Sequence, residues 1–104
     1  MSLSLICQAI NSNPPHLIQF YYTGDAVPGY RMVEPHMVAY NEAEHLSLSG
    51  WLTTGATASG SPGWKEYLLA SISKVTVLGE TFSGPRPGYN PTGRKKVHNV
   101  QCAI

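Results

Sequence analysis

The stretch from Tyr30 to Tyr40 constrains the fold most, because it carries extended runs on both sides of a proline. Residues 30–33 and 36–40 have the composition of strands, whereas Pro35 has no N–H to donate to a sheet ladder. The proline therefore predicts a break or a bulge inside one bent strand. The segments before and after this strand would supply the partners that pair with it and close a small barrel.

Those flanking segments predict one short helix and several more strands. Apolar residues at nearly helical spacing predict a helix over residues 2–10, which the Asn-Ser-Asn-Pro-Pro run then ends. Alternation of apolar and polar residues between turns rich in Gly and Pro predicts the strands. These strands cover residues 16–22, 45–52, 64–69, 72–78 and 95–104. Residues 53–63 are expected to form a loop, and residues 83–93 are poor in regular structure.

Five or six short strands at regular spacing predict a mainly β fold, either a barrel or a sandwich. In the strand over residues 45–52, Leu48 and Leu52 should face the core while Trp51 points away, and Gly50 indicates a bulge or a tight bend. The short N-terminal helix is not stable alone and would cover the open end of a barrel. With 104 residues, the chain forms a single domain over residues 1–104.

The charge content points to a surface that associates with something. Charged residues make up 12% of the chain, about half the usual share of roughly 25%, which favours a partner or a homodimer. The net charge of +1 creates no general attraction for nucleic acid. Basic residues gather after the last acidic residue, and they form either a solvated tail or a phosphate-binding patch. They are Arg86, Arg94, Lys95 and Lys96.

The cysteines and the N-terminal segment bear on the location of the protein. Cys7 and Cys102 lie near opposite ends of the chain, and two thiols without a secretory segment are expected to be buried and reduced. No apolar run reaches the ~18 residues of a membrane helix. Residues 1–10 lack the basic region of a signal peptide. We expect a cytoplasmic protein that does not enter a membrane.

The residues give no pattern that predicts catalysis. No serine elbow, phosphate loop or paired-carboxylate signature occurs, so we expect a non-enzymatic protein without a cofactor. The histidines have no spacing that would complete a zinc site, and no metal is expected. They are His16, His36, His45 and His98.

Several segments match one known family in order along the chain. The most specific is Arg31-Met32-Val33-Glu34-Pro35, which is similar to an Arg-x-Val-Glu-Pro motif. Residues 5–10, 19–22 and 64–72 look like the leading helix, the first strand and a later strand of that family, and residues 82–90 resemble the tail of its small stand-alone members. Together these segments resemble the WYL domain. The triplet that names the family falls on Leu46-Ser47-Leu48, where only one leucine matches.

The resemblance implies a small Sm-like or SH3-like barrel that binds a ligand in a basic, aromatic groove. The ligand would be a small molecule such as a nucleotide, or a single-stranded nucleic acid, and the role would be regulatory, as in transcription regulation. Arg31 would present a planar fork to a phosphate or carboxylate, while aromatic rings would stack on a base. The predicted ligand-binding residues are Arg31, His36, Trp51, Trp64, Lys65 and Tyr67.

Each of these residues also has a structural interpretation. Arg31 would form an internal salt bridge with Glu34, Glu44 or Glu66, and His36 would be a solvated histidine on a bent strand. The aromatic residues would instead pack in the core or in an interface. This second interpretation applies to Tyr22, Tyr30, Trp51, Trp64 and Tyr67. Trp51 lies on the polar face of its strand, which favours a binding or dimer contact. The alternative function is therefore a homodimeric protein-interaction module without a small-molecule ligand.

Overall fold

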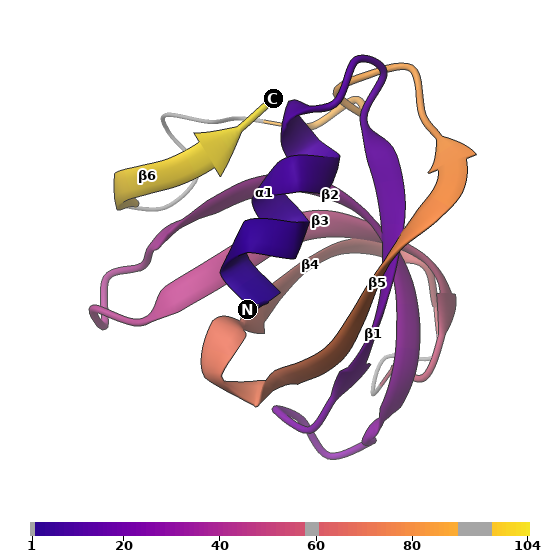
Figure 1. The fold of residues 1–104 in the computed structure, drawn as a ribbon. Coiled ribbons are helices and arrows are strands. Elements are labelled where there is room, and N and C mark those ends of the chain that lie inside the picture. Colours follow the sequence, from indigo (N-terminus) through magenta and orange to yellow (C-terminus); the bar gives the residue numbers. More distant parts are fainter. Residues whose placement is uncertain (1, 58–60, 90–96) are drawn as a thin grey trace.

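The computed structural model describes residues 2–57, 61–89 and 97–104, and these form one helix and six strands (Figure 1). The helix is α1 (Ser2–Asn11). The strands are β1 (His16–Tyr22), β2 (Gly29–Tyr40), β3 (Leu46–Gly55), β4 (Gly63–Leu68), β5 (Ile72–Thr81) and β6 (His98–Ala103). A single 3-10 turn, η1 (Leu69–Ser71), connects β4 to β5.

The strands form one antiparallel sheet in which β2 has the central place. The strand order is β4-β3-β2-β1-β5, and β6 pairs with the C-terminal half of β2. The mainly β class with one short N-terminal helix is therefore confirmed. The strand predicted to organise the chain is also the one with most partners, because β2 pairs with β1, β3 and β6.

The sheet curves but does not close into the predicted barrel. In the described part of the chain, β4 and β5 end the strand order, and no ladder joins them. The turn η1 covers the step between them, where the backbone N–H of Thr23 donates to the carbonyl of Ser71 over 3.2 Å. The hydroxyl of Tyr22 accepts a hydrogen bond from the Leu68 N–H over 2.9 Å. Both contacts join the end of β1 to the connection between β4 and β5.

Pro35 introduces the bulge that the sequence predicts. The register between β2 and β3 shifts between Pro35 and Met37, while the strand continues on both sides. Gly50 lies opposite Pro35, and a Cβ at that position would lie 2.6 Å from the Val33 side chain. The absence of a side chain at Gly50 therefore allows the two strands to approach where they bend.

Several strand boundaries differ from the prediction. The β3 strand runs on to Gly55 and β4 begins at Gly63, so the loop between them is shorter than residues 53–63. The β5 strand continues to Thr81. Of the predicted strand over residues 95–104, residues 95 and 96 lie outside the described residues. Val100 on β6 is 50% exposed, and β6 pairs only with the end of β2.

The core lies between the concave side of the sheet and α1. The helix packs against β1, β2, β5 and β6, so it covers the open side of the sheet as predicted (Figure 1). It buries Ile6, Ala9 and Ile10. The sheet contributes Leu48 and Leu52 from β3, both almost fully buried, as their alternation predicts. No helix in the described ranges has the length and apolar character needed to cross a membrane.

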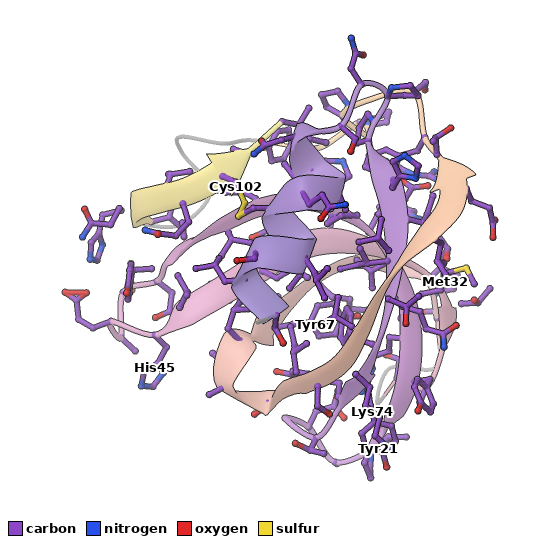
Figure 2. All side chains as sticks on the ribbon, in the orientation of Figure 1. Tyr21, Met32, His45, Tyr67, Lys74 and Cys102 are labelled. Carbon is purple, nitrogen blue, oxygen red and sulfur yellow. A yellow bond between two sulfur atoms is a disulfide. The ribbon has the colours of Figure 1, made fainter. Side chains whose placement is uncertain are left out.

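Cys7 and Cys102 form a disulfide, so the expectation of reduced cysteines is wrong. Their Cα atoms lie 5.6 Å apart, and the bond joins α1 to β6 (Figure 2). The sequence separation of 95 residues hides this proximity. It arises because β6 pairs Cys102 with Val38, on the part of β2 that α1 also covers.

Candidate functional site

Three side chains from neighbouring strands form a row across the outer side of the sheet. In the register, Glu34 on β2 lies opposite Trp51 on β3, and Trp51 lies opposite Trp64 on β4. The two indole rings meet edge to face, with centroids 5.8 Å apart. His36 follows two positions after Glu34, and its ring lies 4.7 Å from that of Trp64. We call the surface formed by Glu34, His36, Trp51 and Trp64 the His36 face.

His36 is fully buried, and both nitrogens of its ring have partners. The Nδ1 atom lies 2.8 Å from the Glu34 carbonyl oxygen, and Nε2 lies 3.1 Å from the Arg86 backbone nitrogen. Because the Arg86 N–H can only donate, Nε2 accepts and Nδ1 carries the proton. Burial lowers the pKa of His36, which outweighs the opposing effect of Glu34. The ring is therefore neutral near pH 7.

The His36 face is covered by residues 82–89 of the same chain, which we call the covering segment. Its aromatic residues contact the His36 ring, with centroid distances of 5.4 Å for Phe82 and 5.0 Å for Tyr89. Tyr89 also stacks on Trp64 with an interplanar angle of 20°, and the indole N–H of Trp64 donates to the Pro87 carbonyl over 3.2 Å. No residue from 82 to 89 belongs to a strand.

One ion pair anchors the covering segment at its centre. The guanidinium of Arg86 donates to both carboxylate oxygens of Glu34, over 2.7 and 3.0 Å. The Glu34 side chain is only 8% exposed, whereas that of Arg86 is 40% exposed. The guanidinium carbon also lies 4.7 Å from the centre of the Trp51 ring, a cation–π distance. The hydrogen bond with Glu34 raises the pKa of Arg86, so the guanidinium keeps its charge.

The covering segment does not fill the space around this pair. A hollow of about 420 Å³ is lined by Glu34 and residues 82–87. The described residues place no group of three His, Cys, Asp or Glu side chains where it could hold a metal ion. The His36 face presents flat rings, one carboxylate, and one neutral imidazole.

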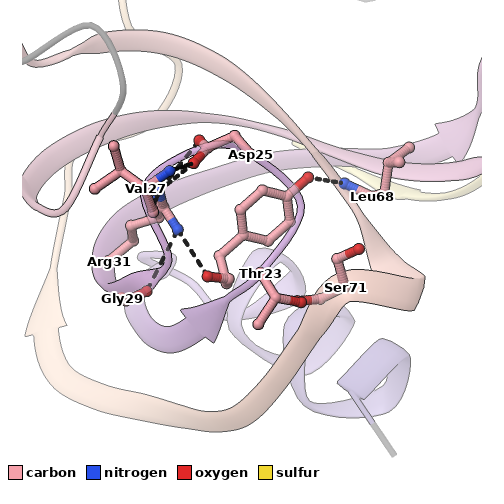
Figure 3. Close-up of polar contacts among 8 residues, drawn as sticks. Thr23, Asp25, Val27, Gly29, Arg31, Leu68 and Ser71 are labelled. Carbon is pink, nitrogen blue, oxygen red and sulfur yellow. Dashed lines mark hydrogen bonds and ion pairs between the residues drawn. The ribbon is translucent and has the colours of Figure 1, made fainter.

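Arg31, which we expected to hold a ligand, is turned into the protein and is 1% exposed (Figure 3). Its Nη2 donates to both carboxylate oxygens of Asp25 over 3.1 Å and to the Val27 carbonyl over 2.6 Å. Its Nη1 donates to the carbonyls of Tyr22 and Gly29. The internal salt bridge that we considered does form, but its partner is Asp25 rather than Glu34, Glu44 or Glu66.

Comparison with known proteins gives no independent assignment: no protein-family model, curated protein or solved structure matches the chain. The resemblance to the WYL domain thus stays a prediction based on the segments quoted above. The candidate site depends on geometry alone.

Two more of the predicted ligand-binding residues lie away from the His36 face. Tyr67 is 3% exposed and packs edge to face against Phe20 and Tyr22 in the interior (Figure 2). Burial raises its pKa to about 12, and its hydroxyl has no hydrogen-bond partner among the described residues. Lys65 follows Trp64, so strand alternation directs it to the other side of β4. The structure thus brings together His36, Trp51 and Trp64.

The other aromatic candidates are also separated. Tyr22 is in the core, whereas Tyr30 is 46% exposed. Tyr30 meets Tyr21 across the β1–β2 pair with ring centroids 5.2 Å apart, and the Lys74 ammonium lies 5.6 Å from the centre of the Tyr21 ring. We call Tyr21, Tyr30 and Lys74 the tyrosine patch. Of the predicted basic group, Arg94, Lys95 and Lys96 lie outside the described residues, whereas Arg86 is paired with Glu34.

Three members of the site, Glu34, Arg86 and Tyr89, were not among the predicted ligand-binding residues. Glu34 was considered as a motif residue and as a partner for Arg31, Arg86 as part of the basic group, and Tyr89 as part of a family pattern. One signal was available: a carboxylate in the middle of an otherwise apolar strand needs a cation when it is buried. Which cation meets it depends on how residues 82–89 fold back, and periodicity contains no information about that.

Proposed function

We propose that this protein is a non-enzymatic, regulatory interaction module whose His36 face binds an extended segment of a partner protein. One observation carries the proposal: an irregular segment of the same chain already docks on this face through its side chains. Aromatic surfaces that receive proline-containing segments are a recurrent means of peptide recognition, because such segments lose little conformational entropy on binding.

The charges of the site favour a peptide over an anionic ligand at this face. Arg31 is withdrawn into the fold, and the charged group that the sheet itself presents there is the Glu34 carboxylate. A carboxylate beside two indole rings attracts a cation and repels a phosphate. The regulatory role that the resemblance implies would then be carried out through a protein partner.

A peptide-display selection tests this function without assuming the sequence of the partner. The target is a variant with Arg86→Ala and Tyr89→Ala, which removes two side-chain anchors of the covering segment; we call it the opened variant. The matched control adds Trp64→Ala to the opened variant. We expect peptides that bind the opened variant and are lost on the control. A selection that enriches nothing, or enriches the same peptides on both targets, would contradict the proposal.

A second candidate function, binding of a nucleotide or a single strand of nucleic acid, is favoured by the tyrosine patch. Two tyrosine rings beside an ammonium group are suited to base stacking next to a phosphate contact. Titration with short single strands should show binding that Tyr30→Ala and Lys74→Ala weaken and that Trp64→Ala leaves unchanged. Equal binding by all these proteins, or binding that is insensitive to salt, would exclude this function.

The location of the protein stays a prediction from the sequence. We expected the cytoplasm, but the Cys7–Cys102 disulfide is typical of oxidising compartments and argues against it. Fractionation of cells, with the thiols alkylated before lysis, would decide between these locations.

A further inference from the structure

We propose that the partner of the His36 face is a proline-flanked arginine segment, and that residues 82–89 are its intramolecular competitor. This inference depends on the proposed function and specifies the chemistry of the partner. The covering segment, Phe-Ser-Gly-Pro-Arg-Pro-Gly-Tyr, makes with the face the contacts of a bound peptide.

The arginine is the specific element of this contact. The guanidinium of Arg86 meets Glu34 through two parallel hydrogen bonds and lies against the Trp51 ring. A bidentate pair of this kind requires the planar fork of arginine, and a lysine cannot reproduce it. Because the Glu34 carboxylate is nearly buried, an occupant without this cation would leave a charge unpaired. The face therefore selects arginine over other side chains.

The flanking prolines and Tyr89 fit the remainder of the face. The carbonyl of Pro87 accepts from the Trp64 indole, and the Tyr89 ring lies parallel to that indole. Gly88 adopts a φ of +93°, and a Cβ there would lie 3.0 Å from the Trp64 Nε1 atom. The segment is thus shaped to the tryptophan on its C-terminal side.

The covering segment is held by side-chain contacts and isolated hydrogen bonds rather than by a strand ladder, which makes it displaceable. Ser83, Pro85, Pro87 and Gly88 are exposed, and residues 82–89 contribute no strand pairing. Glu34 and residues 82–87 also line a hollow of about 420 Å³. Segments with few buried contacts open at a small fraction of the global unfolding free energy. An external peptide would nevertheless compete with an internal one whose effective concentration is of millimolar order.

The test is a titration of defined protein variants with a synthetic peptide of residues 82–89. Intrinsic tryptophan fluorescence reports the site directly, because both tryptophans of the chain, Trp51 and Trp64, lie on the His36 face. We expect the opened variant to bind the peptide at least about tenfold more tightly than the wild type, since the competitor is weakened. Adding Glu34→Gln to the opened variant should weaken binding about tenfold or more.

Peptide variants test the chemistry of recognition. The peptide with Arg86→Ala should not bind, and the one with Arg86→Lys should bind about tenfold less tightly or worse. Equal binding of the arginine and alanine peptides, or no binding to an opened variant that is folded by circular dichroism, would overturn the inference. Should the opened variant fail to fold, Gly88→Ala provides a second way to weaken the covering segment with Arg86 retained.

The titration and the display selection fail in different ways. If the selection yields binders without arginine while the 82–89 peptide does not bind, the partner chemistry is wrong and the interaction function stands. If neither the library nor the peptide binds the opened variant, both proposals are wrong.

Discussion

Substitution of Arg31 by alanine should damage the fold rather than a binding site. Its side chain is 1% exposed, and it donates to the carbonyls of Tyr22, Val27 and Gly29 as well as to Asp25. The substitution leaves the buried Tyr22 carbonyl without this donor, which costs about 1–3 kcal/mol. It also removes the cation from the Tyr22 ring, 5.0 Å away, worth about 0.5–2 kcal/mol, and leaves a void.

The two quantified contributions sum to a loss of about 1.5–5 kcal/mol, and the void adds to it. A domain of this size has about 5–15 kcal/mol in total, so Arg31→Ala should be strongly destabilised but partly folded. The matched control is Asp25→Asn, which keeps an acceptor at a side chain that is 34% exposed, and should cost about 1 kcal/mol.

Urea unfolding followed by circular dichroism measures both losses. The difference between Arg31→Ala and Asp25→Asn tests whether the arginine acts mainly through backbone carbonyls. If Arg31→Ala lost less than about 1 kcal/mol, the side chain would not hold the fold together, and the ligand-binding role predicted from the sequence would regain support.

Four further outcomes follow from individual contacts. The free energy of unfolding should fall as the pH drops below the unfolded-state histidine pKa of about 6.5. Burial lowers the pKa of His36 in the folded protein, so the unfolded chain takes up the proton first. Urea unfolding of His36→Gln across this pH range should show a smaller change of stability with pH. Replacing both Cys7 and Cys102 by serine should cost about 4–5 kcal/mol by loop entropy, and unchanged urea midpoints with and without reductant would contradict this. Tyr67→Phe removes a buried hydroxyl that has no hydrogen-bond partner among the described residues, so thermal unfolding should show unchanged or slightly higher stability. A loss of stability above about 1 kcal/mol would indicate a hydrogen-bond partner for this hydroxyl. Gly88→Ala should disturb the covering segment by about 1 kcal/mol or more and shift the tryptophan emission, whereas an unshifted spectrum would show that Trp64 tolerates the added Cβ.

Local patterns in the sequence determined the elements of the fold. Alternation identified the β1 strand over residues 16–22, which matches the structure at both ends, and the missing N–H of Pro35 predicted the bulge in β2. The same alternation placed Leu48 and Leu52 in the core and Trp51 outside it. These predictions succeed because side-chain direction in a strand depends on adjacent residues. The family resemblance also placed His36, Trp51 and Trp64 among the candidates, and these three rings lie together in the structure.

The tertiary structure alone decided which side chains meet one another. Whether Arg31 faces a ligand or Asp25 depends on how the turn before β2 folds back, and both arrangements have the same local sequence. The pairing of Cys7 with Cys102 depends on where α1 crosses the end of β2, and the pairing of Glu34 with Arg86 on the return of residues 82–89. Hydrophobic periodicity reports which side of an element is buried, but not which distant segment buries it.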